Sequence, residues 1–350
     1  MRNYLRFILA SLVLLYLTGF VGFDKSQEMI RNQQSEKQTV NRGSSNNAKK
    51  LLKFLHEIKG KYTLTGMHSF LEKPDLYAEK IKQITGNYPA IKGYELGGIL
   101  NQQPSQLQKE RDGVVKSAIG WHKSGGIVAM TYHIHLPGEC YCWKKVNNGG
   151  ISQEEFKKII TPGTEQYKKH LKDLDDAAIY LKKLRDAGVP VLWRPYHEMN
   201  GGWFWWGRQP EFTKLWDIMY KRFTEYHDLN NLLWVWSPGA PDEWSDPFES
   251  YYVGSKKADV LALDIYHNKY KKEHHDQLIA LAKGKPIAIG ENGHLPTPSL
   301  LNNDLKSYTW FMAWGNLLEE TNSKDVIQTL FKEDRVLNLN EMLTKRKETK

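Results

Sequence analysis

Two glutamates, Glu198 and Glu291, stand at the ends of two short apolar runs in this 350-residue chain. Two carboxyl groups that face each other across a cleft can take complementary catalytic roles. One protonates a leaving oxygen as a general acid, while the other attacks carbon or activates water. Cleavage of a glycosidic bond requires this arrangement, with separations of about 5–5.5 Å for retention and about 6.5–9.5 Å for inversion. A lone glutamate at a strand end is often only an ion-pair partner, so catalysis is indicated by the two glutamates together and not by either alone.

Aromatic side chains crowd around the first glutamate. The chain holds 12 Trp, and the run WFWW (203–206) follows Glu198 closely. Sugar rings offer apolar faces to an indole, while their hydroxyl groups need polar partners at the edge, and Trp combines an apolar body with a polar N–H. Four neighbouring aromatics cannot all face one groove. We therefore expect Trp203 to be the first sugar platform and Trp314 the second.

Short apolar runs alternate with amphipathic segments, which is the pattern of an α/β fold. The predicted strands are 62–66, 90–94, 126–133, 189–196, 232–237, 260–266, 286–291 and 310–314. The predicted helices are 74–84, 106–124, 163–187, 211–228 and 274–283. Eight such units predict a single (β/α)8 TIM barrel, although a doubly wound sheet would alternate in the same way. The tryptophans inside predicted strands are expected in the core: Trp193, Trp234 and Trp236.

Polar and aromatic side chains gather where five of these runs end, and this favours the barrel. The carboxyl ends of the strands form the active face of a (β/α)8 barrel, so we expect the catalytic site there. The side chains at these ends include His133, His135, Arg194, His197, Asp264, Tyr266, His267, Asn292 and Trp314.

Four motifs resemble glycoside hydrolase family 26, most of whose members are endo-β-1,4-mannanases. They are RPYHEMNGGWFWWG (194–207), DIYH (264–267), IGENG (289–293) and WFMAWGN (310–316), in the family's order. The resemblance implies a (β/α)8 barrel, a retaining double displacement and no metal or organic cofactor. It also implies β-mannan polysaccharide or manno-oligosaccharides as the partner, including galactomannan and glucomannan.

Carried over by position, the resemblance makes Glu198 the acid/base and Glu291 the nucleophile. His197 would hydrogen-bond the reacting sugar or the nucleophile, and Tyr266 would contact the nucleophile and help set its charge. The aromatic surroundings of Glu198 are expected to raise its pKa, because burial disfavours an ionised carboxyl group.

Five further residues take substrate-binding roles from the same resemblance. His133 would contact the sugar in the subsite before the cleavage point. Trp203 and Trp314 would line the subsites on either side of that point. Asp264 and Arg194 would be polar supports beneath the site.

The sequence departs from the family after the third predicted strand. His135-Leu136-Pro137 stands where the family often has Asn-Pro, so the asparagine is missing. A long segment, 138–161, follows. A loop of this length could close one end of the groove, which would favour short products such as mannobiose over internal cleavage.

The N-terminal 23 residues have the pattern of a cleaved signal peptide. Arg2 and Arg6 precede the apolar run 7–17, and small residues follow. The run is short for a membrane span, so we expect export to the periplasm or the medium and no stable membrane anchor. The predicted organisation continues with a flexible linker at 24–46, the catalytic domain at 47–340 and a basic tail at 341–350.

The formal net charge of +9 is spread along the chain and mixed with acidic residues. With no phosphate-binding loop, this pattern argues against nucleic acid as a partner, and we expect a monomer. Cys140 and Cys142 are two residues apart, so a bridge between them would be strained. We therefore expect two unpaired thiols, which alone do not make a zinc site.

Three alternatives stay open at this point. A metal-dependent hydrolase could use the histidine pairs 133/135 and 274/275, although a clear third ligand is missing. A non-catalytic sugar-binding barrel would use the aromatics but has no need of two opposed glutamates. Another β-glycanase of the same family, acting on β-1,3-xylan or mixed-linkage β-glucan, would keep the same machinery.

Overall fold

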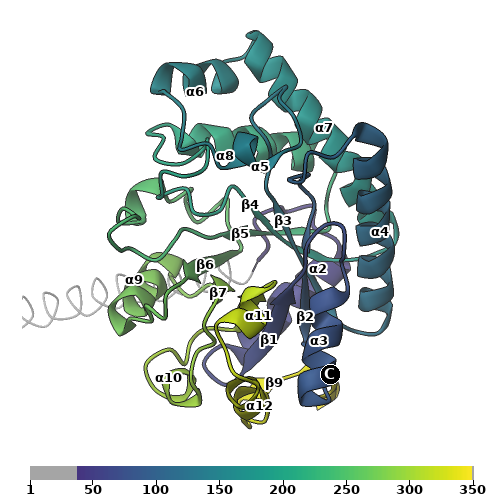
Figure 1. Ribbon diagram of the computed structural model, residues 1–350, viewed down its shortest axis with the longest axis vertical. Helices are drawn as coiled ribbons and strands as arrows, with labels where there is room; N and C mark the ends of the chain where they lie inside the picture. The colour runs from purple at the N-terminus through teal and green to yellow at the C-terminus, as the bar shows by residue number, and fades with distance from the viewer. Residues whose placement is uncertain (1–37, 349–350) are drawn as a thin grey trace, which may run out of the picture. The chain divides into compact units, whose positions relative to one another are not determined.

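The computed structural model describes residues 38–348, and these form a closed parallel β-barrel surrounded by helices (Figure 1). The strands are β1 (Thr63–His68), β2 (Ile91–Glu95), β3 (Ile127–Tyr132), β4 (Val191–Pro195), β5 (Leu232–Trp236), β6 (Val260–Ile265), β7 (Ile287–Asn292) and β8 (Trp310–Trp314). Each strand pairs in parallel with the next, and β1 pairs with both β8 and β2, which closes the barrel. The short strand β9 (Val336–Leu337) adds to β1. The predicted (β/α)8 fold is confirmed.

Helices follow the strands and cover the outside of the barrel. They are α2 (Asn46–Ile58), α3 (Leu76–Thr85), α4 (Pro104–Lys123), α5 (Trp143–Val146), α6 (Gln153–Ile160), α7 (Glu165–Asp186), α8 (Phe212–Lys221), α9 (Lys272–Ala282), α10 (Pro298–Asn302), α11 (Leu317–Glu320), α12 (Lys324–Phe331) and α13 (Leu339–Glu348). A π-helical turn, η1 (Arg222–Tyr226), extends α8, and a 3₁₀ turn, η2 (Glu249–Tyr251), precedes β6. All five predicted helices are present, with small changes at their ends. No described helix is long and apolar enough to cross a membrane.

The strands are almost entirely buried because each lies between the barrel interior and the outer helices. The three tryptophans inside strands, Trp193, Trp234 and Trp236, are fully buried, as predicted. Local signals set the helix ends. Ser152 and Glu155 form a capping box at the start of α6, and Gly86, with φ of 81°, ends α3 in a left-handed conformation.

Both ends of the described chain pack on the barrel, and this moves two predicted boundaries. The signal peptide and the linker as far as residue 37 lie outside the described residues. The rest of the predicted linker is bonded to the domain: the Val40 N–H donates to Asp259 Oδ1 at 2.7 Å, and Ser45 N–H donates to Asn230 O at 2.7 Å. The predicted basic tail is instead the helix α13, whose Met342 is fully buried.

Candidate active site

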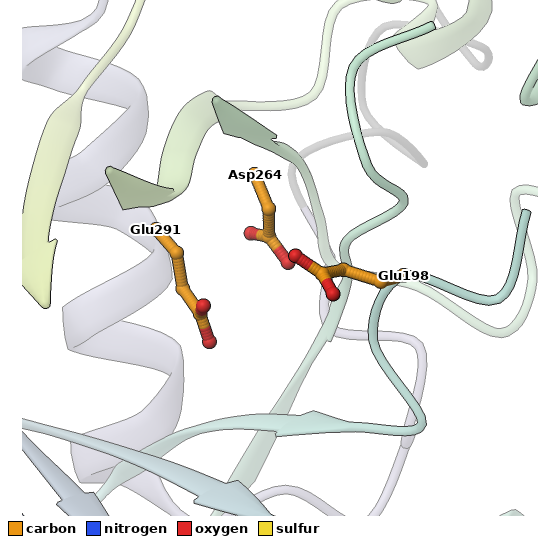
Figure 2. Close-up of side chains that lie close together, drawn as sticks. All are labelled: Glu198, Asp264 and Glu291. Carbon is orange, nitrogen blue, oxygen red and sulfur yellow. The ribbon is translucent and has the colours of Figure 1, made fainter. Parts of the chain in front are cut away.

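Three carboxylates meet at the carboxyl ends of the strands. Asp264 lies on β6, Glu291 lies on β7, and Glu198 lies on the loop after β4 (Figure 2). One oxygen from each lies within 4.8 Å of the others. Their exposed fractions are only 8% for Glu198, 2% for Asp264 and 3% for Glu291. Buried charges at this spacing must be balanced by donors or by protons.

Glu198 is presented by an unusual backbone turn. Tyr196 and Glu198 have φ of 46° and 55°, in the left-handed region that non-glycine residues rarely adopt. The turn is held on both sides, because the Glu198 N–H donates to Ser237 O at 2.8 Å and its carbonyl accepts from Gly201 N–H at 3.0 Å. Strain of this kind persists only where surrounding contacts fix it, and it is concentrated at functional sites.

The surroundings of Glu198 favour its protonated form. Burial, together with the negative charge of Glu291, raises the pKa of this carboxyl group to about 7. The Trp203 indole N–H donates to Glu198 Oε2 at 2.7 Å and opposes this rise. Because Oε2 accepts the indole hydrogen, Oε1 is the oxygen from which a proton can be given to a ligand.

Both carboxylate oxygens of Glu291 accept hydrogen bonds from neighbouring side chains. The Arg194 guanidinium donates to Oε1, and the Tyr266 hydroxyl donates to Oε2 at 2.5 Å. The same guanidinium donates to Asp264 Oδ2 at 2.9 Å, so one cation serves two buried carboxylates. Arg194 therefore links Asp264 and Glu291, and the polar supporting role expected for Arg194 and Asp264 stays a prediction.

His197 lies beside the same carboxylate as a neutral ring. Burial lowers its pKa well below the usual value. Its Nε2 is 3.6 Å from Glu291 Oε1. The Nδ1 atom is buried and has no hydrogen-bond partner among the described residues. A neutral ring beside a carboxylate places its one hydrogen on the nearer nitrogen, so Nε2 carries the N–H and faces Glu291.

A cavity of about 430 Å³ opens above these carboxylates, and its size lies within the range of small-ligand sites, about 300–1,000 Å³. Its walls carry the two predicted platforms, Trp203 and Trp314, together with His133. Trp205 and Trp206, by contrast, are fully buried. The run of four aromatics thus divides, with Trp203 and Phe204 lining the cavity and the other two in the core.

Two exposed tryptophans in the cavity wall were not predicted. Trp143 is 43% exposed at the start of α5, and Trp244 is 55% exposed on the loop after β5. Lys269 lies over the Trp244 ring, 4.7 Å from its centre. The sequence does not show that the segments carrying these two tryptophans face the site, so neither could be assigned to it from the sequence.

Another residue that sequence reasoning missed is Glu95, the last residue of β2. Its Oε2 is 2.6 Å from Nδ1 of His133, and both side chains are buried. Applying the strand-end rule to β2 would have found this carboxylate, because it occupies the position that Asp264 and Glu291 occupy near the ends of β6 and β7.

The loop 138–161 contains a disulfide between Cys140 and Cys142, so the prediction of two free thiols was wrong. The Cα atoms lie 5.4 Å apart, within the usual range for a bridge, because the chain between them bends back. The loop also carries α5 and α6, and the Asn148 N–H donates to Trp203 O at 3.0 Å. It therefore forms one wall of the cavity beside Trp203.

The histidines of the metal-site alternative are dispersed. His133 is bonded to Glu95, His135 lies 3.5 Å from Asp173, and the pair 274/275 lies on α9. In the described part of the chain, the only close group of three metal-ligating side chains is the carboxylate group Glu198, Asp264 and Glu291. Arg194 already bonds two of its three members.

Comparison with known proteins places this geometry in a family. The family model described as Glycosyl hydrolase family 26 matches residues 40–341. A mannan endo-1,4-beta-mannosidase of Thermothelomyces thermophilus is 33% identical over 323 residues, which cover 87% of this chain and 64% of that protein. The chain spans about half to two thirds of the length of the first curated relatives that it matches.

Solved structures agree with the barrel. The structure of GH26A from Muricauda sp. MAR_2010_75 has a TM-score of 0.81 and 37% identity, covering 86% of this chain and 99% of that one. A beta-mannanase from a symbiotic protist of the termite Reticulitermes speratus, solved with gluco-manno-oligosaccharide, has a TM-score of 0.75 and 28% identity. That match covers 87% of this chain and 97% of that one.

Proposed function

The chain belongs to glycosyl hydrolase family 26, and from this premise we propose that it is a retaining endo-β-1,4-mannanase acting on mannan, galactomannan or glucomannan. One observation carries the proposal. Glu198 and Glu291 have carboxylate oxygens within 4.8 Å of each other, and their surroundings differ: the pKa of Glu198 is raised to about 7, while Glu291 accepts hydrogen bonds from Arg194 and Tyr266. This is the division of roles that glycoside hydrolysis by two carboxyl groups requires.

In the first step, Glu198 gives its proton from Oε1 to the glycosidic oxygen, and the bond from that oxygen to the anomeric carbon breaks. Glu291 attacks the same carbon and forms a glycosyl ester. Arg194 and Tyr266 hold the two oxygens of Glu291 and so fix the direction of attack. The His197 Nε2 atom lies on the same side, 3.6 Å from Glu291 Oε1.

In the second step, Glu198 is a carboxylate and takes a proton from water. The water oxygen bonds to the anomeric carbon, and the ester to Glu291 breaks, which restores both groups. Two inversions at one carbon give net retention of configuration. The separation of at most 4.8 Å between carboxylate oxygens supports retention, because an inverting site needs about 6.5–9.5 Å to hold a water.

The mechanism is tested by proton NMR of the first product formed from manno-oligosaccharides. A retaining enzyme releases the β anomer first, and the α anomer then appears by mutarotation. Initial release of the α anomer would overturn the double displacement. Glu291→Ala should release no product, and near-normal turnover of mannan by that variant would overturn the nucleophile assignment.

The substrate is tested on linear mannan, galactomannan, xylan and mixed-linkage glucan, with reducing ends and chain lengths followed together. Cleavage of mannan with a ladder of oligomers would support endo action. Early accumulation of one disaccharide would indicate a groove closed at one end, with the loop 138–161 as the first element to shorten. Cleavage of xylan or mixed-linkage glucan instead of mannan would favour the other β-glycanase, and binding without any product would favour a sugar-binding barrel.

We further propose export through the signal pattern of residues 1–23. A mature N-terminus found after residue 17 by sequencing of the secreted protein would support export. Retention of the intact leader would contradict cleavage.

A further inference from the structure

A third buried glutamate lies beside the cavity and has no part in the proposed mechanism. Glu95 is 1% exposed at the end of β2. Its Oε1 accepts three backbone N–H groups, and its Oε2 contacts two side chains. These partners are the N–H groups of Leu96 at 3.0 Å, Gly97 at 2.5 Å and His133 at 3.0 Å, the Thr131 hydroxyl at 2.8 Å and His133 Nδ1 at 2.6 Å.

We propose that Glu95 is a positioning residue that fixes His133 on the cavity wall as a doubly protonated ring whose Nε2–H donates to a hydroxyl group of the bound sugar. The inference rests on the proposed function for the identity of the ligand. It extends that function by naming the residue that sets the orientation and the protonation state of His133.

The hydrogen-bond directions support this assignment. A carboxylate only accepts, so the Thr131 hydroxyl donates to Glu95 and has a lone pair left for His68 Nε2, 2.9 Å away. His68 therefore carries its hydrogen on Nε2. Burial lowers the pKa of His68 to about 3, and its Nδ1 has no partner among the described residues, which agrees with a neutral ring.

The same chain of contacts reaches one of the sugar platforms. The His68 ring stacks on the Trp314 ring with centres 4.1 Å apart and planes at 18°. The His133 ring lies 5.7 Å from Trp314 on another side. Glu95 is thus connected through Thr131 and His68 to the Trp314 ring, and directly to His133. Trp314 and His133 both line the cavity.

Two glycines make room for this network. A Cβ on Gly93 would lie 2.7 Å from His68 Cδ2, and a Cβ on Gly97 would lie 2.3 Å from His133 O and 2.9 Å from Glu95 Oε1. All three distances are below normal contact, so any side chain at either position would displace the His68 ring, the His133 backbone or the Glu95 carboxylate.

The charge of His133 follows from its neighbours. Burial alone would lower its pKa, but the Glu95 carboxylate outweighs burial and raises it. Burial would likewise raise the pKa of Glu95, but His133 holds it at about 2. The titratable and charged groups facing His133 are Glu95, Glu291, Glu198, Arg194, His197 and His68. With Nδ1–H committed to Glu95, Nε2–H remains for a ligand in the cavity that His133 lines.

The test uses Glu95→Gln in the full chain, with Glu79→Gln as a matched control on the surface helix α3. The amide oxygen of the variant can still accept the three backbone N–H groups, so the turn keeps its partners. The amide nitrogen cannot accept from Nδ1–H, so His133 must lose its charge. We expect the variant's kcat/KM on mannohexaose to fall about 10- to 100-fold, the range for losing a hydrogen bond to a charged group.

The readout that separates positioning from simple stability is the imidazole pKa of His133, followed by NMR titration. It should lie above 6.5 in the native chain and in Glu79→Gln, and fall in Glu95→Gln. A native value at or below 6.5 would overturn the inference even if Glu95→Gln does not fold. So would an unchanged kcat/KM in a folded variant.

A double-mutant cycle with His133→Ala completes the design. If Glu95 acts through His133, adding Glu95→Gln to His133→Ala should change kcat/KM less than twofold. Independent effects of the two substitutions would contradict the inference. If the native chain cleaves no mannan, the proposed function fails, while the titration of His133 still decides how Glu95 sets its charge.

Discussion

Trp203→Phe is the substitution that tests the electrostatics of the site most directly. It keeps an apolar ring in the cavity wall but removes the indole N–H that donates to Glu198 Oε2 at 2.7 Å. This donor stabilises the ionised carboxylate and lowers its pKa against the effect of burial. Its loss should therefore raise the pKa of Glu198 above about 7.

The size of the shift follows from the bond. A hydrogen bond to a charged group contributes about 1.5–3 kcal/mol, and one pKa unit corresponds to about 1.4 kcal/mol. Water can replace part of the lost bond, because Trp203 borders an open cavity. We therefore expect an upward shift of about one unit.

The assay is the pH dependence of kcat/KM on mannohexaose. Its alkaline limb reports the ionisation of the acid in the free enzyme. The limb should lie near pH 7 in the native chain and about one unit higher in Trp203→Phe. Trp314→Phe is the control, since it loses ring area without touching Glu198, so its limb should not move. An alkaline limb that stays in place or moves down in Trp203→Phe would refute this account of Glu198.

Three further predictions concern stability. Folding raises the pKa of Glu198 from 4.5 to about 7, so ionisation of this group destabilises the fold as pH rises through that window. Glu198→Gln should therefore have the same free energy of unfolding as the native chain at pH 4. At pH 8 its free energy of unfolding, measured by urea denaturation, should be higher by about 3 kcal/mol. Arg194→Met leaves Asp264 and Glu291 buried without their cation, so it should cost about 3–5 kcal/mol and abolish activity at neutral pH, and a melting temperature within about 2 °C of the native value would contradict this. Asp259→Ala removes the acceptor for the backbone N–H groups of Val40 at 2.7 Å and Trp234 at 2.8 Å. The free energy of unfolding should fall by about 2–4 kcal/mol, and the segment 39–45 should become open to limited proteolysis. An unchanged cleavage pattern would count against this prediction.

The barrel and the centre of the site could be predicted because two signals coincide in the sequence. Each strand is an apolar run of about five residues, and the polar residues that follow it must lie at one end of a closed parallel barrel. That rule brought Glu198, Asp264 and Glu291 together without any knowledge of distances. A separate argument, that four neighbouring aromatics cannot all face one groove, favoured Trp203 as the residue of the run 203–206 that lines the cavity.

Other features depend on contacts that the sequence does not encode locally. The bridge between Cys140 and Cys142 depends on how the loop 138–161 folds back against its neighbours. The helix α13 has a weak apolar pattern, yet it packs because Met342 and Leu343 meet the barrel. The role of Glu95 requires knowing which histidine lies across from β2, and that is a property of the closed sheet.

The double contact of Arg194 bears on how this scaffold can change in evolution. If Glu291 is lost, the guanidinium keeps its bond to Asp264 at 2.9 Å, so no buried cation is left without a partner. Loss of Asp264 likewise leaves the pair with Glu291. Under the proposed function, a single change at position 291 would therefore end turnover and still leave a folded cavity with its tryptophans. Such a variant would bind sugar without cleaving it.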